Sequence, residues 1–117
     1  MKYKIYINQL VLANSGLDLT DCAILDFLLF FCNARNRQIE KYRFIENDYV
    51  YTWVDYKTLM SEMPLLNITH PSNISRRLQK IEKAGYILIS RKHHQKTYVT
   101  LTEKTDELEI RKGKLLL

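Results

Sequence analysis

The most hydrophobic part of the chain runs from Cys22 to Cys32 and is interrupted only by Asp26. Because apolar residues occur on every side of a helix drawn through this segment, we expect a helix at residues 21–34, with Thr20 as its N-cap. A helix without a polar face is either the centre of a core or covered by another molecule. A central helix and a homodimer through residues 21–34 are therefore both open.

The flanking segments give weaker patterns. Tyr3 to Ile7 alternates as a short strand does, and Gln9 to Ala13 could begin a short helix before the breakers at 14–16. Residues 35–48 are polar and mixed in charge, which indicates a loop or an extension of the preceding helix. Tyr49 to Trp53 is aromatic and β-branched, so we expect a strand there.

Residues 55–85 predict two short helices joined by a turn. Asp55 can cap a helix at 56–62 that ends before Pro64, and its inward side chains would be Leu59, Met60 and Met63. After a turn at 65–69, Pro71 suits the first position of a helix at 71–84, and Gly85 suits its C-terminal cap.

The pattern then changes to that of strands, at 86–91 and 97–102, joined by a polar connection at 92–96. The expected fold class is α+β, with a three-helix core and a small antiparallel sheet. We expect one domain over residues 1–117, with a central motif at about 49–102. Residues 103–117 would be a tail or the start of a further segment.

Composition adds limits to this fold. The chain has 117 residues, of which 46% are hydrophobic and 26% charged, a balance typical of one globular domain. Met1 to Ile7 lacks the apolar stretch of a signal peptide, and 22–32 is shorter than the ~20 residues that span a bilayer. We therefore expect a soluble cytoplasmic protein. Cys22 and Cys32 would lie about 15 Å apart on one helix, so we expect buried, reduced thiols.

The positive charge is concentrated in one segment. Residues 71–104 hold eight Lys and Arg against two Glu, a charge of +6, whereas the whole chain has +5 and the remainder therefore −1. Such a segment indicates a polyanionic partner, because each neutralised phosphate releases counterions. A solvated basic surface without a partner is the plain alternative.

The expected helix at 71–84 has two chemically different sides. Ile74, Leu78 and Ile81 form one apolar stripe at helical spacing. The opposite side carries polar and cationic groups only, with Glu82 turned elsewhere: Ser72, Arg76, Gln79, Lys80 and Lys83, with Asn73 at the margin and Arg77 on a flank.

These side chains suit a DNA major groove. Arg can bind guanine bidentately, Asn and Gln can bind adenine, and Ser and Lys can hold phosphates. The preceding helix and turn complete a helix-turn-helix. The connection between the two strands would add contacts to the DNA backbone or the minor groove from Arg91, Lys92, His93, His94, Gln95 and Lys96.

The order strand, helix, turn, helix, glycine and basic hairpin at 49–102 resembles the winged-helix superfamily. The segment "ISRRLQKIEKAGYI" is similar to winged-helix domains of phage and plasmid replication proteins and of DnaD-like primosomal proteins, and less closely to MarR-type regulators. This resemblance implies a winged helix-turn-helix in replication or transcription control. It also implies DNA contacts from Ser72, Asn73, Ser75, Arg76, Arg77 and Lys80, and wing contacts from Arg91, Lys92 and Lys96.

Other chemistries have little support. His70, His93 and His94 have no Cys pair or carboxylate nearby in the sequence, so no metal or other cofactor is expected. Glycine-rich phosphate loops and nucleophile motifs are missing, so we expect no enzyme and no small-molecule ligand. Capping and solvation would explain Asp18, Asp21 and Asp26. Trp53 could stack on bases, but we expect it in the core.

Three functional hypotheses remain. The first is sequence-specific binding of double-stranded DNA. The second is a winged-helix protein–protein interaction module, because one fold supports many functions. The third is nucleic-acid binding with little sequence preference. The cationic side of the helix at 71–84 favours DNA over a protein partner, which would usually need an exposed apolar patch.

Overall fold

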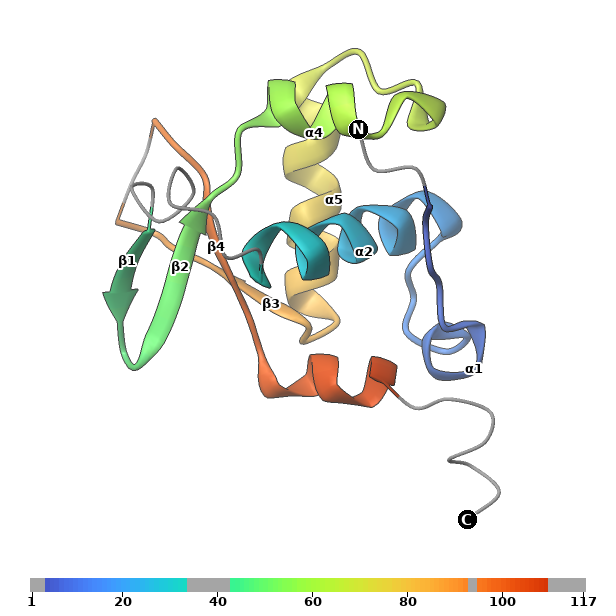
Figure 1. The fold of residues 1–117 in the computed structure, drawn as a ribbon, viewed down its shortest axis with the longest axis horizontal. Coiled ribbons are helices and arrows are strands. Elements are labelled where there is room, and N and C mark those ends of the chain that lie inside the picture. The colour runs from blue at the N-terminus through green and yellow to red at the C-terminus, as the bar shows by residue number, and fades with distance from the viewer. Residues whose placement is uncertain (1–3, 34–42, 93–94, 110–117) are drawn as a thin grey trace.

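The computed structural model describes residues 4–33, 43–92 and 95–109. In this part of the chain two helices come first, and two pairs of strands follow, one before and one after the helices at 56–62 and 71–83, which confirms the α+β class (Figure 1). The elements in chain order are α1 (Gln9–Leu12), α2 (Leu19–Asn33), β1 (Arg43–Glu46), β2 (Tyr49–Trp53), α4 (Tyr56–Glu62), the 3₁₀ helix η1 (Pro64–Leu66), α5 (Pro71–Lys83), β3 (Ile87–Ile89), β4 (Tyr98–Leu101) and the 3₁₀ helix η2 (Glu103–Glu109).

The four strands form one antiparallel sheet in the order β1-β2-β4-β3. The strands β2, β3 and β4 are the predicted ones, with slightly shorter bounds for the last two. β1 was expected as loop or helix, and that expectation is wrong. Asn47 and Asp48 both have positive φ, at 51° and 66°, which is the turn geometry that favours a two-residue hairpin. The turn pairs Phe44 with Tyr51 across the hairpin.

The helix α2 is the centre of the core. Its residues from Asp21 to Leu28 are all buried, and it contacts both α5 and β4. In Figure 1 it crosses in front of α5, with the sheet on one side and α1 on the other. The buried cluster built around it extends from Leu12 to Leu108. Of the two interpretations of this apolar helix, the structure supports the central position.

The start of α2 differs from the expectation, because Asp18 and not Thr20 caps the helix. The Asp21 backbone N–H donates to Asp18 Oδ1 at 2.8 Å, and the Asp18 backbone N–H donates to Asp21 Oδ2 at 3.1 Å. This reciprocal pair is a capping box built from two aspartates three residues apart. It satisfies two backbone donors at the helix end and holds both carboxylates beside α5.

Asp21 joins α2 to α5 by charge. Its carboxylate is fully buried, with Arg77 Nη1 2.8 Å from Oδ1 and Lys80 Nζ 2.6 Å from Oδ2. Asp21 was expected to be a solvated capping residue; it does cap the helix, but it is not solvated. A buried carboxylate is tolerated only when cations or hydrogen-bond donors compensate its lost hydration. The two cations of α5 supply that compensation and fix the position of α5 on α2.

Two short helices joined by a turn form at residues 55–85, as the sequence predicts. Asp55 caps α4 through the Lys57 N–H, and Pro71 is the first residue of α5. The buried side of α5 consists of the predicted stripe, Ile74, Leu78 and Ile81. Gly85, with φ of +95°, ends the helix, and the amides of residues 85 and 86 bond to the carbonyls of 82 and 81. This arrangement is a Schellman motif, which requires the left-handed conformation at residue 85.

The two ends of the described chain meet near α2. Residues 4–8 form no strand, contrary to expectation, but Asn8 Nδ2 donates to the Leu108 carbonyl at 3.1 Å. Residues 103–109 were expected as a tail but form η2. This helix places the Leu108 side chain in the hydrophobic core cluster. The predicted end of α2 at residue 34, the loop at 35–42 and residues 110–117 lie outside the described residues.

We expect Asp21→Asn to lower the free energy of unfolding by about 3 kcal/mol, because it leaves Arg77 and Lys80 without their buried counter-charge. The value lies at the low end for buried pairs, since Lys80 keeps 42% of its side chain in solvent. Urea unfolding followed by circular dichroism measures it. Asp106→Asn, on an exposed carboxylate, should change stability by less than about 0.5 kcal/mol. Equal stabilities of the two variants would contradict this role of Asp21.

Candidate nucleic-acid interface

The outward side of α5 is polar and cationic. Ser72, Arg76, Gln79 and Lys83 are exposed, as predicted, and Ser75 is half-buried. The acid of the helix, Glu82, does not lie among them. Every exposed side chain of α5 is therefore neutral or positively charged, and the exposed set also includes Pro71.

Asn73 is half-buried and acts within the helix. Its Oδ1 accepts hydrogen bonds from Arg76 Nη2 at 3.3 Å and from Arg77 Nε at 3.0 Å. The expected contact of Asn73 with adenine would compete with these bonds, because its acceptor already serves two guanidinium groups. In the described structure Asn73 orients Arg76 one turn further along the exposed side.

Arg77 and Lys80 do not extend freely from α5, and this differs from the expectation. Both side chains turn toward the N-terminus of α2. There the buried carboxylate of Asp21 binds Arg77 and Lys80, and the more exposed carboxylate of Asp18 binds Arg77. The two Asp18 oxygens each lie 3.0 Å from Arg77 Nη1. The Arg77 side chain keeps 17% of its surface exposed. Two acids thus neutralise two of the predicted DNA-binding cations.

The same contacts change the acidity of Asp18. Partial burial would raise the pKa of its carboxyl, but the Asp21 N–H and the Arg77 guanidinium outweigh burial and lower the pKa from 3.8 to about 2. The carboxylate of Asp18 therefore stays charged throughout the physiological range. The interaction with Asp18 and Asp21 also raises the pKa of Arg77.

Glu82 anchors the base of the hairpin formed by β3 and β4. It accepts the Ile89 backbone N–H at 2.7 Å and pairs with Arg91 at 2.5 Å. This contact explains why the acid of α5 is absent from the outward side. It also neutralises Arg91, which was predicted as a wing contact, and holds it against α5.

The other predicted wing residues have separate environments. Lys92 Nζ lies 3.5 Å from Glu46 of β1, and Lys96 Nζ lies 4.7 Å from the centre of the Trp53 ring. Gln95 and Lys96 are exposed. His93 and His94 lie outside the described residues. The hairpin connection therefore combines one cation paired with an acid and one cation placed over an aromatic ring.

Trp53 is not in the main core, contrary to expectation. Along β2, Thr52 and Val54 are buried, with Val54 in the core cluster, so Tyr51 and Trp53 point to the other face of the sheet. On that face the Phe44 ring stacks on Tyr51 at 5.2 Å and meets Tyr98 edge-on at 4.8 Å. These aromatic residues form a second, smaller cluster that joins β1, β2 and β4 on this face of the sheet.

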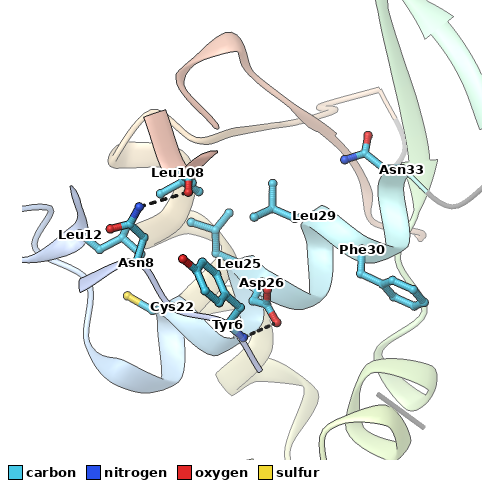
Figure 2. Close-up of a pocket in the computed structure, with 10 residues that line it drawn as sticks. All are labelled: Tyr6, Asn8, Leu12, Cys22, Leu25, Asp26, Leu29, Phe30, Asn33 and Leu108. Atoms are coloured by element: carbon cyan, nitrogen blue, oxygen red, sulfur yellow. Dashed lines mark hydrogen bonds between the residues drawn. The ribbon is translucent and has the colours of Figure 1, made fainter. Parts of the chain in front are cut away.

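A groove of about 600 Å³ lies beside α2 (Figure 2). One wall comes from residues 6–12 of the N-terminal segment, and Leu108 of η2 contributes to another. Its lining is mostly apolar, with Asp26 fixed by the Tyr6 backbone N–H at 3.1 Å. Phe30, at one end of the groove, keeps 56% of its surface exposed. The groove is a second candidate contact surface.

Other site chemistry is limited. Both cysteines are free, with Cys22 buried as predicted and Cys32 half-buried, and burial raises the pKa of the Cys32 thiol to about 12. Within residues 4–33, 43–92 and 95–109, no three His, Cys, Asp or Glu side chains gather as a metal site would require. In the same part of the chain, no helix has the length and apolar character needed to cross a bilayer.

Comparison with known protein families, with curated proteins and with solved structures finds no match for this chain. The sequence pattern pointed to the cations of α5 and of the hairpin but did not find their acidic partners Asp18, Asp21 and Glu46. The aspartate pair had a detectable signal, because acids three residues apart before an apolar run are typical of a capping box.

We expect the contribution of Asp18 to stability to depend on acid pH. Because its folded pKa is lowered to about 2, the contribution is complete above pH 3.8 and is lost as the pH falls toward 2. Since 54% of the Asp18 side chain is exposed, the loss should be at most about 1 kcal/mol. Urea unfolding of the parent and of Asp18→Asn at several pH values measures it. A parent–variant difference that stays constant between pH 5 and about 2 would contradict this assignment.

Proposed function

We propose that this chain binds double-stranded DNA as a winged helix-turn-helix protein, in replication initiation or transcription control of a bacterial, phage or plasmid type. The observation that carries the proposal is the outward side of α5, whose exposed side chains contain no acid. A duplex presents phosphates and base edges that accept and donate hydrogen bonds, and this side offers matching cationic and polar groups.

The connectivity supports the same proposal. The helices α4 and α5 are joined by a short turn with η1, and β3 and β4 follow α5 directly, while β2 pairs with β4. This order is compatible with a winged helix, in which the second helix of the pair enters the major groove. The connection between β3 and β4 would then lie along the DNA backbone beside α5.

The ion pairs divide the proposed contact residues into two groups. Arg76 and Gln79 can reach base edges, Lys83 can reach phosphate, and Ser72 lies in the first turn of α5, where backbone N–H groups favour phosphate. Of the seven predicted DNA-binding cations, four have acidic partners, namely Arg77, Lys80, Arg91 and Lys92. Each neutralised phosphate contributes about −0.9 to the slope of the logarithm of the DNA-binding constant against the logarithm of the salt concentration. Because three of the seven cations have no acidic partner, we expect a slope nearer to about −3 than to about −6.

We expect Arg76→Ala with Lys83→Ala to raise the Kd for duplex DNA about 10- to 100-fold near 100 mM salt, because one base contact and one phosphate contact are lost. Fluorescence anisotropy with a labelled duplex of mixed sequence measures this change. Lys4→Ala, which removes an exposed lysine from the N-terminal segment, is the control for Lys83→Ala and should bind as the parent does. A double variant with unchanged affinity would overturn the proposal.

The groove beside α2 favours a second function, contact with another protein. The exposed ring of Phe30 and the groove lie on the same side of α2, so two copies of the chain could exchange these rings across a two-fold axis. A homodimer through α2 would also bring two copies of α5 into one particle, which binding to two half-sites on DNA requires. This candidate is compatible with DNA binding and does not replace it.

If the groove forms a homodimer, light scattering at high protein concentration should give about twice the chain mass of 14.0 kDa. Phe30→Asp should restore the monomer mass, because a carboxylate cannot enter an apolar groove without losing its hydration. Leu65→Asp, which changes an exposed leucine of η1 in the same way, is the control. A parent that is monomeric at every concentration would exclude the homodimer.

A further inference from the structure

We propose that Asp18 is a positioning residue that limits the sequence-independent part of the proposed DNA contact by keeping Arg77 away from phosphates. The inference rests on the proposed function and concerns which cations of α5 are available. Arg77 belongs to the basic helix but is bound to Asp18 through both carboxylate oxygens, each 3.0 Å from Nη1. A DNA phosphate would have to replace the Asp18 carboxylate to bind Arg77 Nη1.

The charge balance explains why Asp18 matters separately from Asp21. Asp21 contacts both Arg77 and Lys80, so one buried carboxylate serves two cations. Asp18 supplies the second negative charge, and the four groups together are neutral. Without the Asp18 charge, Arg77, Lys80 and Asp21 have a net charge of +1 on the flank of α5.

The position of Asp18 makes it the adjustable member of this cluster. Its side chain is 54% exposed, whereas Asp21 is fully buried and holds the two helices together. Removal of the Asp18 charge therefore leaves the buried attachment of α5 in place. Because asparagine caps a helix as well as aspartate does, Asp18→Asn also keeps the acceptor for the Asp21 N–H.

The consequence for binding follows from the difference between phosphate and base contacts. A cation that reaches phosphates strengthens binding to every sequence, whereas Arg76, on the exposed side, can distinguish bases. Preventing an unwanted contact raises specificity without strengthening any correct contact. Asp18 thus acts through Arg77 and need not contact DNA itself.

The test compares Asp18→Asn with the parent and with Asp106→Asn, which makes the same charge change on the exposed surface of η2. Anisotropy titrations use one duplex of mixed sequence at a series of salt concentrations. We expect Asp18→Asn to bind about three- to tenfold more tightly near 100 mM salt and to steepen the salt slope by up to about 0.9, equivalent to one more phosphate contact. Asp106→Asn should change the slope by much less.

A second variant removes the charge with a different capping side chain. Asp18→Ser keeps a capping oxygen but cannot form the ion pair, so its salt slope should match that of Asp18→Asn. Thermal unfolding checks that each variant is folded at the assay temperature. Loss of the cap alone would lower stability without steepening the salt slope.

The outcomes distinguish this inference from the function on which it rests. If the parent binds the duplex and Asp18→Asn has the same slope and affinity as Asp106→Asn, the role of Asp18 is wrong and the proposed function stands. If the parent does not bind the duplex at any salt concentration, both are overturned. A steeper slope in both Asp18 variants, with no such change in Asp106→Asn, supports the inference.

Discussion

The buried carboxylate of Asp21 is the constraint on which the position of α5 depends. It lies at the first turn of α2, accepts a backbone hydrogen bond from Asp18, and is bound by Arg77 and Lys80. A charge without solvent would be strongly unfavourable alone, so the two helices must meet where those cations reach it. Together with the apolar stripe of α5, these ion pairs set the place at which α5 lies on α2.

This constraint also decides which surface of α5 faces solvent. With Ile74, Leu78 and Ile81 in the core and Arg77 directed toward α2, Arg76 and Gln79 point away from the protein. On the other flank, Glu82 is occupied by β3 and Arg91. The outward side is free of acid because Glu82, the acid of α5, is engaged with Arg91 and the Ile89 backbone N–H. The proposed DNA contact depends on that arrangement.

The sheet has a comparable division of roles. One face covers α2 through Thr52 and Val99, and the other carries the aromatic cluster of Phe44, Tyr51 and Tyr98. Lys92 reaches Glu46 and Lys96 covers Trp53, so the cations of the hairpin connection lie against the protein. A contact of Lys92 with DNA would require exchange of its ion pair with Glu46. The outward side of α5 needs no such exchange, which makes it the main element of the proposed interface.

Local features were determined by the sequence alone. The bounds of α4 and α5, the glycine cap, the apolar stripe and the strand β2 followed from capping residues, proline positions and periodicity, because these act between neighbours in the chain. The pattern also located Ser72, Arg76, Gln79 and Lys83 correctly on the exposed side. It did not find β1, whose pairing depends on a two-residue turn without glycine, or the burial of Leu108 at the far end of the chain.

Only the tertiary structure decided which cations of residues 71–104 are paired with acids. Residues 71–104 have a charge of +6 along the sequence, yet Asp18, Asp21 and Glu46, from distant positions, are brought against three of those cations. Electrostatic interaction depends on distance in space, and the separation of residues along the chain does not reveal it. The folded arrangement therefore leaves fewer cations for a polyanion than the composition of the segment suggests.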